Sequence, residues 1–329
     1  MMLILVFSVV FALVLDLVLG DPKNKYHPTA WVGILIGKFA PYGKSDNPSL
    51  EKLGGVALVV GVTTLVGTLL YLTYGTFAYL NNLDLGLSKI LVVASSVIAV
   101  GILLKTTIAI RGMQRHASKI MESLSRDDLE GARENLSMIV KRNTKNLDRQ
   151  HIISATLESI SENIVDGITG PLFYFAFFGL AGAFVYRAVN TVDSMVGYKT
   201  DLFRNLGWFG ANCDKVLNFV PSRLTSTIMI LAGMIVGSNW RHSAAIMKRD
   251  GPKTESPNAG YPMATMAGAL GVKFEKLDHY VLGDGSTEFT EKHFKTAVSM
   301  MKVTAVLFAA LFTIPVIVLL SYLGWWNIA

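Results

Sequence analysis

The sequence has few charged residues for its length. Only 16% of the 329 residues are charged, whereas 51% are hydrophobic; soluble domains usually carry about 25% charged residues. This shortage excludes an ordinary soluble domain and points to a chain that lies in a lipid bilayer. The runs 53–80, 90–104 and 303–326 contain no charge, and the run 3–19 contains only Asp16. Since a membrane-spanning helix needs roughly 20 apolar residues, we expect four spans.

Other features are missing as well. A single cysteine, Cys213, excludes an intramolecular disulfide and a cysteine-cluster metal site. The segment from Gly33 to Lys38 is one residue too short for a P-loop, and no Ser or Thr follows its lysine. No metalloprotease helix, serine-nucleophile elbow, internal repeat or strand-like alternation is present. The predicted fold is therefore all-α: a polytopic integral membrane protein with cytoplasmic helical insertions, with re-entrant helices as an open alternative.

The topology follows from the loops. Basic residues cluster after the first and third predicted spans, which places those segments in the cytoplasm and the N-terminus outside. The first span lacks a basic leading region and a small-residue cleavage site, so we expect it to be retained. Two apolar segments, 171–186 and 224–236, are short; each could be a tilted span, a re-entrant element or a buried helix. We expect one membrane domain over 1–329, with an amphipathic insertion at 105–170 and a cytoplasmic loop region at 239–302.

Local signals divide the insertion into helices. Ser125 and Asp128 resemble a capping box that opens a helix running through Val140. The residues 142–144 break that helix, and Asp148 begins the next one. Farther along, the three prolines and two glycines of 251–262 predict a loop. The pair Gly233 and Gly237 could pack helices within one subunit or between two.

Three acidic residues recur at helical spacing. Glu158, Glu162 and Asp166 are four residues apart and would share one face of a helix. Like charges at that spacing repel one another, by a few tenths of a kcal/mol per pair, unless a cation or basic partner lies opposite. Mg²⁺ prefers such oxygen ligands, often together with substrate phosphates. The alternative is a solvated acidic face, but the apolar residues between the acids favour a functional site.

Three further segments carry polar residues of the same kind. Arg187, Asn190, Asp193, Ser194 and Lys199 adjoin an apolar stretch, where polar groups are costly unless paired; snorkelling of Arg187 and Lys199 is the simpler alternative. Asp21 and His27 follow the first span, where a histidine before proline is more often a structural loop residue. The 256–262 segment could present Asn258 and backbone N–H groups to a ligand, and a tight connector is its alternative.

Together these segments resemble one family. They read LDLVLGDPKNKYHPTAWVG (15–33), ATLESISENIVDGITGPLFY (155–174), YRAVNTVDSMVGYK (186–199) and SPNAGYPMATMAGALGV (256–272). This order is similar to that of the CbiB/CobD family of cobalamin biosynthesis, adenosylcobinamide-phosphate synthase. The resemblance implies a multi-pass inner-membrane ligase that joins adenosylcobyric acid to an aminoalcohol phosphate, using ATP and Mg²⁺. One departure is Asn143, where the family usually has aspartate between Arg142 and Thr144; it removes a carboxylate there and leaves Arg142 and Thr144 available.

The resemblance suggests roles for the candidate residues at a site that faces the cytoplasm. Carboxylates would bind Mg²⁺ or the amine, with Glu162, Asp166 and Asp193 as metal ligands and Glu158 beside them. Cations would bind phosphates, and Asn side chains would hydrogen-bond the substrate. The predicted phosphate- and substrate-binding residues are Asp21, His27, Arg142, Thr144, Asn163, Arg187, Asn190, Ser194, Lys199 and Asn258.

Two other functions are alternatives to this hypothesis. The main alternative is a membrane transporter for a corrinoid or an organic anion; transporters place ionisable residues near the bilayer midplane, and the four clear spans have almost none. A second alternative is a scaffold for soluble pathway enzymes. The net charge of +6 fits an anionic membrane face or anionic substrates rather than nucleic acid. The lipid bilayer is the expected partner, and a homo-oligomer or other pathway enzymes stay open.

Overall fold

A computed structural model describes the chain except for residues 23, 83–87, 198–202, 277 and 328–329. The all-α prediction is confirmed, because 79% of the chain is helical. One detail differs: a short antiparallel hairpin pairs β1 (Phe274–Lys276) with β2 (Tyr280–Leu282). Three residues per strand are too few for an alternating pattern to stand out in the sequence. The chain forms two compact units, one comprising 1–108, 170–217 and 309–329, the other comprising 109–169 and 218–308.

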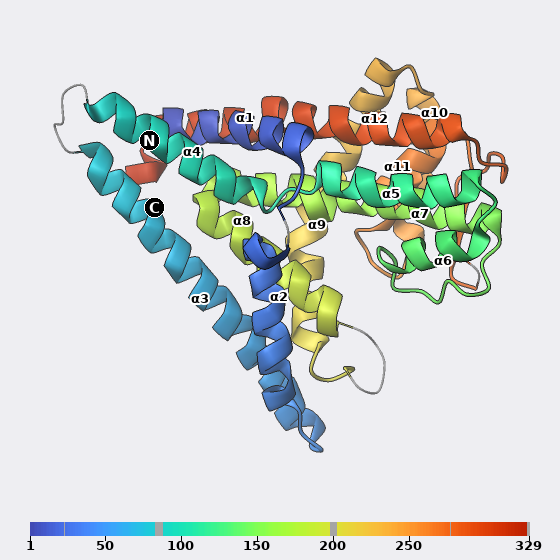
Figure 1. Ribbon diagram of the computed structural model, residues 1–329, viewed down its shortest axis with the longest axis horizontal. Helices are drawn as coiled ribbons and strands as arrows, with labels where there is room; N and C mark the ends of the chain where they lie inside the picture. Colours follow the sequence, from blue (N-terminus) through green and yellow to red (C-terminus); the bar gives the residue numbers. More distant parts are fainter. Residues whose placement is uncertain (23, 83–87, 198–202, 277, 328–329) are drawn as a thin grey trace. The chain divides into compact units, whose positions relative to one another are not determined.

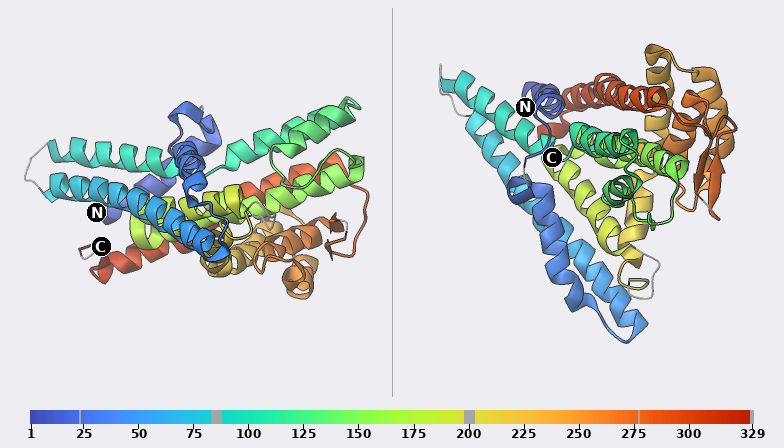
Figure 2. Two further views of the ribbon diagram at one scale, coloured as in Figure 1. Left: turned by 90° about the horizontal axis from the view of Figure 1, so that it is seen from below. Right: turned by 45° about the vertical axis from the view of Figure 1, so that its right-hand side comes forward.

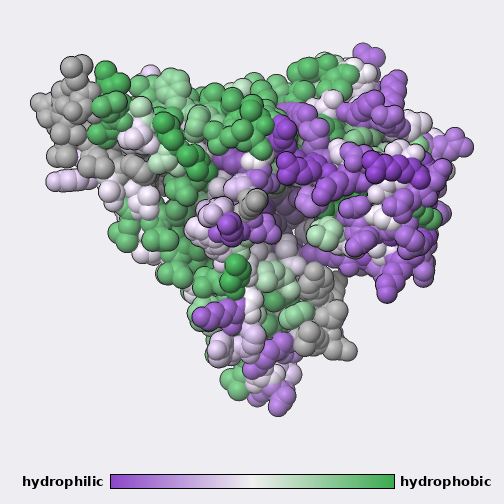
Figure 3. Space-filling view, viewed as in Figure 1, coloured by the Kyte–Doolittle hydropathy of each residue, from purple (hydrophilic) through white to green (hydrophobic). Residues whose placement is uncertain are grey.

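Unit 1 holds most of the hydrophobic helices. Its helices are α1 (Met2–Leu19), η1 (Asn24–Tyr26), α2 (Pro28–Phe39), η2 (Ala40–Gly43), α3 (Pro48–Asn82), α4 (Ser88–Lys105), α8 (Gly170–Val196), η5 (Ala309–Thr313), α13 (Ile314–Tyr322), η6 (Trp325–Asn327) and the first part of α9 (Trp208–Val236). Helix α1 packs along α4, and α2, α3 and α8 share a core of aliphatic side chains. Figure 3 shows hydrophobic residues over α3 and α4. The exposed face of α1 is also apolar, as a bilayer requires; it presents Leu3, Phe7, Val10, Val14 and Val18.

Helix α8 turns back on itself at Gly179. That residue has φ 59° and ψ −147°, which breaks the helix at a conformation that favours glycine. In a straight helix Tyr174 and Tyr186 would lie about 18 Å apart, but their rings stack with centroids 5.2 Å apart. Gly170 likewise faces Tyr186, and a Cβ there would lie 2.3 Å from the hydroxyl. The segment 171–186 is therefore a helical hairpin (Figure 1), which agrees with the re-entrant alternative.

Unit 2 contains the more polar helices. It comprises α5 (Ile110–Ser125), α6 (Leu129–Ser137), α7 (Arg149–Ile164), the π-helical turn η3 (Val165–Thr169), the second part of α9, α10 (Trp240–Asp250), η4 (Gly251–Lys253), α11 (Gly260–Leu270), the β-hairpin and α12 (Glu291–Phe308). Hydrophilic residues cover α5 and α6 in Figure 3. Helix α7 begins after Asp148, as predicted, and the Asp148 carboxylate caps it by accepting from the His151 N–H at 2.9 Å.

Three local predictions in unit 2 need correction. Asp128, not Ser125, caps α6, because its carboxylate accepts from the Gly131 N–H at 2.8 Å; the helix ends at Ser137, three residues before Val140. The predicted loop 251–262 contains η4 and the first turn of α11. Gly237 lies beyond the end of α9 at φ 77°, so it terminates that helix and does not form a helix-packing pair with Gly233.

By length and composition, six helical segments of the described chain could cross a membrane. Four correspond to the predicted spans, which lie within α1, α3, α4 and the continuous segment α12–η5–α13. The fifth candidate runs over 149–196, but the hairpin at Gly179 shows that it does not cross as one straight helix. The sixth is α9, which contains the segment 224–236 and has Pro221 in its interior. In Figures 1 and 2, the second part of α9 runs across the direction of α12.

Candidate active site

Titratable side chains meet in unit 1 where α1 and α4 end and α2 begins. Lys105, the last residue of α4, places Nζ 2.5 Å from Asp21 Oδ1 and 3.2 Å from Asp16 Oδ1. The side chains of Lys105 and Asp16 are 3% and 0% exposed. Charges buried to this degree are tolerated when they are paired. The Lys105 ammonium therefore holds the first connector against α4 and neutralises the carboxylate at the end of α1.

The same group brings the predicted pair Asp21 and His27 together. His27 Nε2 lies 3.6 Å from Asp21 Oδ1, and Thr29 anchors the start of α2 by donating to the Thr106 carbonyl at 2.7 Å. Burial raises the pKa of Asp21, but hydrogen bonds and charge from His27 and Lys105 outweigh it and lower the pKa. Asp21 is thus a carboxylate at neutral pH. The buried Nδ1 atom of His27 has no hydrogen-bond partner within the described part of the chain.

A second polar group in unit 1 links α8 to the first part of α9. Arg187 donates to the Asn190 side-chain oxygen at 3.2 Å, and the Asn190 amide donates to Asp214 Oδ1 at 3.2 Å. Asn190 is buried, so both of its polar atoms need partners. Asp193 folds back against Gly197, where a Cβ would lie 2.2 Å from the Asp193 carboxylate oxygen. Glycine at 197 therefore leaves room for the carboxylate.

The packing of α2 on α8 relates the two groups of unit 1. A Cβ at Gly33 would lie 3.8 Å from Thr191 and 3.7 Å from Met195, and one at Gly37 would lie 3.5 Å from Met195. The two helices therefore run in the same direction, as Figure 1 also shows. Moving back one or two turns along both helices leads to His27, the residue directly before α2, and to Arg187 on α8. The predicted polar residues of unit 1 are thus carried on, or directly before, two helices that pack side by side.

In unit 2 a buried carboxylate on α7 holds three segments together. Glu158, which is 2% exposed, accepts from Arg142 at 2.5 Å, from the Tyr280 hydroxyl at 2.8 Å and from the Ser154 hydroxyl at 2.8 Å. Ser154 in turn accepts from the Glu275 N–H of β1 at 3.3 Å. Both oxygens of Glu158 are engaged by these donors. The carboxylate therefore positions Arg142 and the β-hairpin on α7.

Tyr280 lies in a low-dielectric, negatively charged environment. Burial, and then the charge and hydrogen bond of Glu158, raise the pKa of Tyr280 well above its usual range. The phenol is therefore a neutral donor at every physiological pH. Glu162, one turn beyond Glu158, is exposed and takes no part in this hydrogen-bond group.

The π-helical turn η3 carries Asp166 away from the regular α7 register. Its Oδ1 accepts from the Asn218 amide of α9 at 3.2 Å, and Thr169 and Thr225 share a hydrogen bond of 2.6 Å beside it. Asp166 thus lies where the wider π-helical geometry replaces the regular register of α7. Such turns often occur at functional sites.

Arg223 secures the predicted 256–262 segment. Its guanidinium lies 3.7 Å from the Phe219 ring centroid and 4.3 Å from that of Tyr261, and it donates to Asn258 Oδ1 at 3.1 Å and to the Pro257 carbonyl at 3.3 Å. Asn258 is buried. This cation between two rings therefore fixes both the backbone and the Asn258 side chain of the segment.

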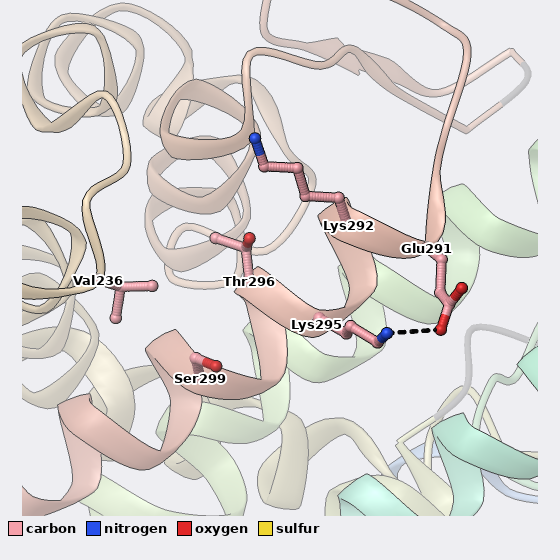
Figure 4. Close-up of a pocket in the computed structure, with 6 residues that line it drawn as sticks. All are labelled: Val236, Glu291, Lys292, Lys295, Thr296 and Ser299. Atoms are coloured by element: carbon pink, nitrogen blue, oxygen red, sulfur yellow. Dashed lines mark ion pairs between the residues drawn. The ribbon is translucent and has the colours of Figure 1, made fainter.

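A cavity of about 390 Å³ also lies in unit 2, between the end of α9 and the first turns of α12 (Figure 4). In the view of Figure 4, Lys295 points to Glu291, with which it forms an ion pair of 2.8 Å, while Lys292 extends in another direction. None of the predicted site residues lines the cavity; it is bounded by Val236, Glu291, Lys292, Lys295, Thr296 and Ser299. We therefore build the candidate site from the polar groups described above.

Comparison with known proteins identifies the family. The family model described as CobD/Cbib protein matches residues 9–321. The chain belongs to the CobD/CbiB family. The "Probable cobalamin biosynthesis protein CobD" of Methanothermobacter thermautotrophicus is 39% identical over 298 residues, covering 90% of this chain and 93% of the relative. The "Cobalamin biosynthesis protein CobD" of Dehalococcoides mccartyi is 37% identical over 273 residues, covering 83% and 85%. No solved structure matches the chain.

These relatives place the protein in cobalamin biosynthesis, and the family motifs can now be located in the two units. Unit 1 contains Asp21, His27, Arg187, Asn190, Asp193 and Ser194; unit 2 contains Arg142, Thr144, Glu158, Glu162, Asn163, Asp166 and Asn258. Lys199 lies outside the described residues. Thr144 is buried, and Asn163 donates to the Ser159 carbonyl of its own helix at 2.9 Å. The roles of all these residues in this CobD/CbiB protein stay predictions.

Sequence reasoning missed the residues that hold the predicted ones in place. Lys105 pairs with Asp21, Asp214 with Asn190, Asn218 with Asp166, and Tyr280 with Glu158. Each partner is distant in the sequence, and no local spacing connects it to its motif. Of these partners only Lys105 could have been noticed in the sequence, because it directly follows the uncharged run 90–104, where a charged side chain needs a partner.

Proposed function

We propose that this protein is an ATP- and Mg²⁺-dependent amide ligase. It would join a carboxylate of adenosylcobyric acid to the amine of aminopropanol phosphate or ethanolamine phosphate, giving adenosylcobinamide phosphate. Membership of the CobD/CbiB family over residues 9–321 is the observation that carries this proposal. The polar groups on α7, α8 and the connector after α1 support it, because a scaffold without a ligand would not need them.

The chemistry requires activation of a carboxylate. In the proposed reaction a corrinoid carboxylate oxygen attacks the γ-phosphorus of ATP, and ADP leaves. The amine then attacks the acyl carbon of the acyl phosphate. The bond between that carbon and the bridging oxygen breaks, so inorganic phosphate leaves with this oxygen, and the amine nitrogen loses a proton. Positioning the two substrates and offsetting phosphate charge would supply most of the rate enhancement. Arg142 in unit 2 and Arg187 in unit 1 are the cations that we assign to phosphate binding. His27, with its buried Nδ1, is a candidate acceptor for the amine proton.

The donors available for Mg²⁺ are carboxylates outside the Arg142 ion pair. Glu158 does not fit, because its oxygens are engaged by Arg142, Ser154 and Tyr280. Glu162 and Asp166 provide hard oxygen donors in unit 2, and Asp193 provides one in unit 1. Within the described residues no group of three or more His, Cys, Asp or Glu side chains could hold a metal ion. In this proposal Glu162 and Asp166 would hold an ion only together with nucleotide phosphates, whose charge the ion would neutralise.

The helical hairpin of α8 bears on the proposed cytoplasmic face. A straight span over 171–186 would carry Asn190 and Asp193 across the bilayer from Gly170. The turn at Gly179 instead returns the chain, so Tyr186 lies beside Gly170. This geometry supports an active face on the side where α8 begins, in the cytoplasm of a multi-pass inner-membrane protein.

An assay with purified components tests the proposal. The protein in lipid nanodiscs is given ATP, Mg²⁺ and adenosylcobyric acid, with aminopropanol phosphate or ethanolamine phosphate in separate reactions. Amide formation, followed by mass spectrometry, and stoichiometric ADP release are expected. Glu162→Gln and Asp193→Asn should abolish turnover while leaving the helical content unchanged. Folded protein that yields neither amide nor ADP would overturn the ligase proposal, and corrinoid uptake into proteoliposomes without amide would support the transporter instead.

A further inference from the structure

Cations from two distant segments of unit 2 act on the Glu162 carboxylate. Lys141 and Arg142 follow α6, and Lys276 ends β1. The positive charges of all three act on the Glu162 carboxylate. The sequence separates Lys141 from Lys276 by more than a hundred residues, so only the fold brings them to one turn of α7.

Hydrogen bonds fix the first segment across this turn. The Ile139 carbonyl accepts from the Ser159 hydroxyl at 3.2 Å, and Arg142 binds Glu158 at 2.5 Å. The residues 139–142 therefore cross α7 beside Ser159 and Glu158, one turn before Glu162. Lys141 lies between the two anchored positions.

The β-hairpin fixes Lys276 in the same region. Lys276 pairs with Tyr280 in the register of the hairpin, and its Nζ lies 5.8 Å from the centroid of the Tyr280 ring. Tyr280 in turn donates to Glu158 at 2.8 Å. Both Lys276 and Arg142 are thus positioned by the same buried carboxylate, although they come from different segments.

The charges of this region suit an anionic ligand. Among the charged groups that act on Glu162, three are cations, Lys141, Arg142 and Lys276, and one is the Glu158 carboxylate. Arg142 is paired with buried Glu158 at 2.5 Å, and Lys141 and Lys276 add positive charge beside Glu162. Lysine ammonium groups bind phosphate as mobile point charges, whereas a neighbouring carboxylate can share a divalent cation with the phosphate.

We propose that Lys141, Arg142 and Lys276 form a phosphate-binding rim around Glu162, and that this rim takes a phosphoryl group of a substrate. The inference rests on the proposed function for its choice between two phosphoryl sources, ATP and the aminoalcohol phosphate. It adds Lys141 and Lys276 to the site, and it gives Glu158 the role of a positioning residue that orients Arg142 and the hairpin.

Ligand titration of the full-length protein in nanodiscs tests the rim. Separate titrations use ATP with Mg²⁺, aminopropanol phosphate, and aminopropanol without phosphate. Lys141→Gln and Lys276→Gln should each weaken the Kd of one phosphorylated ligand by about 10- to 100-fold, the usual loss for one charge-assisted contact. Lys141→Arg and Lys276→Arg should restore most of the affinity. Binding of aminopropanol should not change.

The control is Lys248→Gln, an exposed lysine of α10 in the same unit, which should bind every ligand as the wild type does. The ATP and aminopropanol phosphate titrations identify which phosphoryl group occupies the rim. Wild-type Kd values for both ligands in both folded Lys→Gln variants would overturn the inference, as would a wild type that binds neither ligand. If the Lys→Gln variants bind a phosphorylated ligand more weakly but the wild type forms no amide, the rim is supported and the ligase proposal is refuted. If the wild type forms amide but the variants keep wild-type Kd values, the ligase proposal is supported and the rim is refuted.

Discussion

Removing Arg142 tests whether the buried carboxylate of Glu158 depends on its ion pair. In Arg142→Met, the Glu158 side chain would remain 3% exposed with only the Ser154 and Tyr280 hydroxyls to stabilise it. Breaking a buried ion pair by deleting one partner usually costs about 3–5 kcal/mol. Arg142 itself is 19% exposed, so we expect the lower end, about 3 kcal/mol of unfolding free energy.

The measurement is an SDS unfolding titration in mixed micelles, followed by tryptophan fluorescence. A double variant, Arg142→Met with Glu158→Leu, removes both charges and should be more stable than Arg142→Met alone, because no unpaired charge stays buried. The matched control is Arg149→Met, whose partner Asp127 is exposed; losing that pair should cost at most about 1 kcal/mol. If Arg142→Met unfolds within 0.5 kcal/mol of the control, on the order of experimental additivity, the buried-pair reasoning is wrong.

Three further predictions concern other parts of the molecule. Lys105→Met should destabilise the protein by about 3 kcal/mol, because Asp16 is fully buried; Lys89→Met, at the exposed start of the same helix, should be near neutral in the same titration. Gly170→Ala should lower the free energy of unfolding by about 1–3 kcal/mol, because it presses a methyl group into the Tyr186 ring. Gly61→Ala places its methyl group in open space and should be neutral or stabilising. If Gly61→Ala were the more destabilising of the two, the hairpin would be refuted. Burial raises the pKa of Asp250, but hydrogen bonds from Arg249, Lys253 and the Gly283 N–H outweigh it and lower the pKa far below 3.8. The stabilisation is therefore present above about pH 4 and is lost as the pH falls below it; the thermal midpoints of the wild type and Asp250→Asn should converge below pH 4, and a constant gap down to pH 2.5 would contradict this assignment.

Composition and local pattern predicted the helical membrane architecture well. Runs such as 3–19 and 90–104 predict membrane helices directly, because almost nothing in them could form a solvated surface. Asp148 was also identified as a helix start, since an N-cap acts on the N–H groups of the next turn and needs no distant partner. The prediction of a capping box at Ser125 was wrong. The Asp128 side chain alone caps the start of α6, so Ser125 is the last residue of the preceding helix, α5.

The candidate site was predicted less completely. The motif residues were found, but the structure engages Glu158 with Arg142 and Tyr280, whereas its spacing suggested a metal ligand beside Glu162. Helical spacing predicts which side chains share a face of a helix, but it does not predict which of those side chains is buried in the fold. The π-helical turn at 165–169 adds a shift that residue type does not announce. Tertiary partners decide both matters.

The hairpin of α8 shows how a weak hydrophobic signal can carry structural information. The segment 171–186 is too short for a standard span, and it is rich in small and aromatic residues. Gly170 and Gly182 let the two arms approach, since a Cβ at Gly182 would lie 2.5 Å from the Tyr174 carbonyl oxygen. Tyr174 and Tyr186 then stack across the gap. A run of aromatic and small residues that falls short of bilayer length therefore favours a returning hairpin. Here it brings Tyr186, which directly precedes the polar segment 187–193, back beside Gly170, where α8 begins.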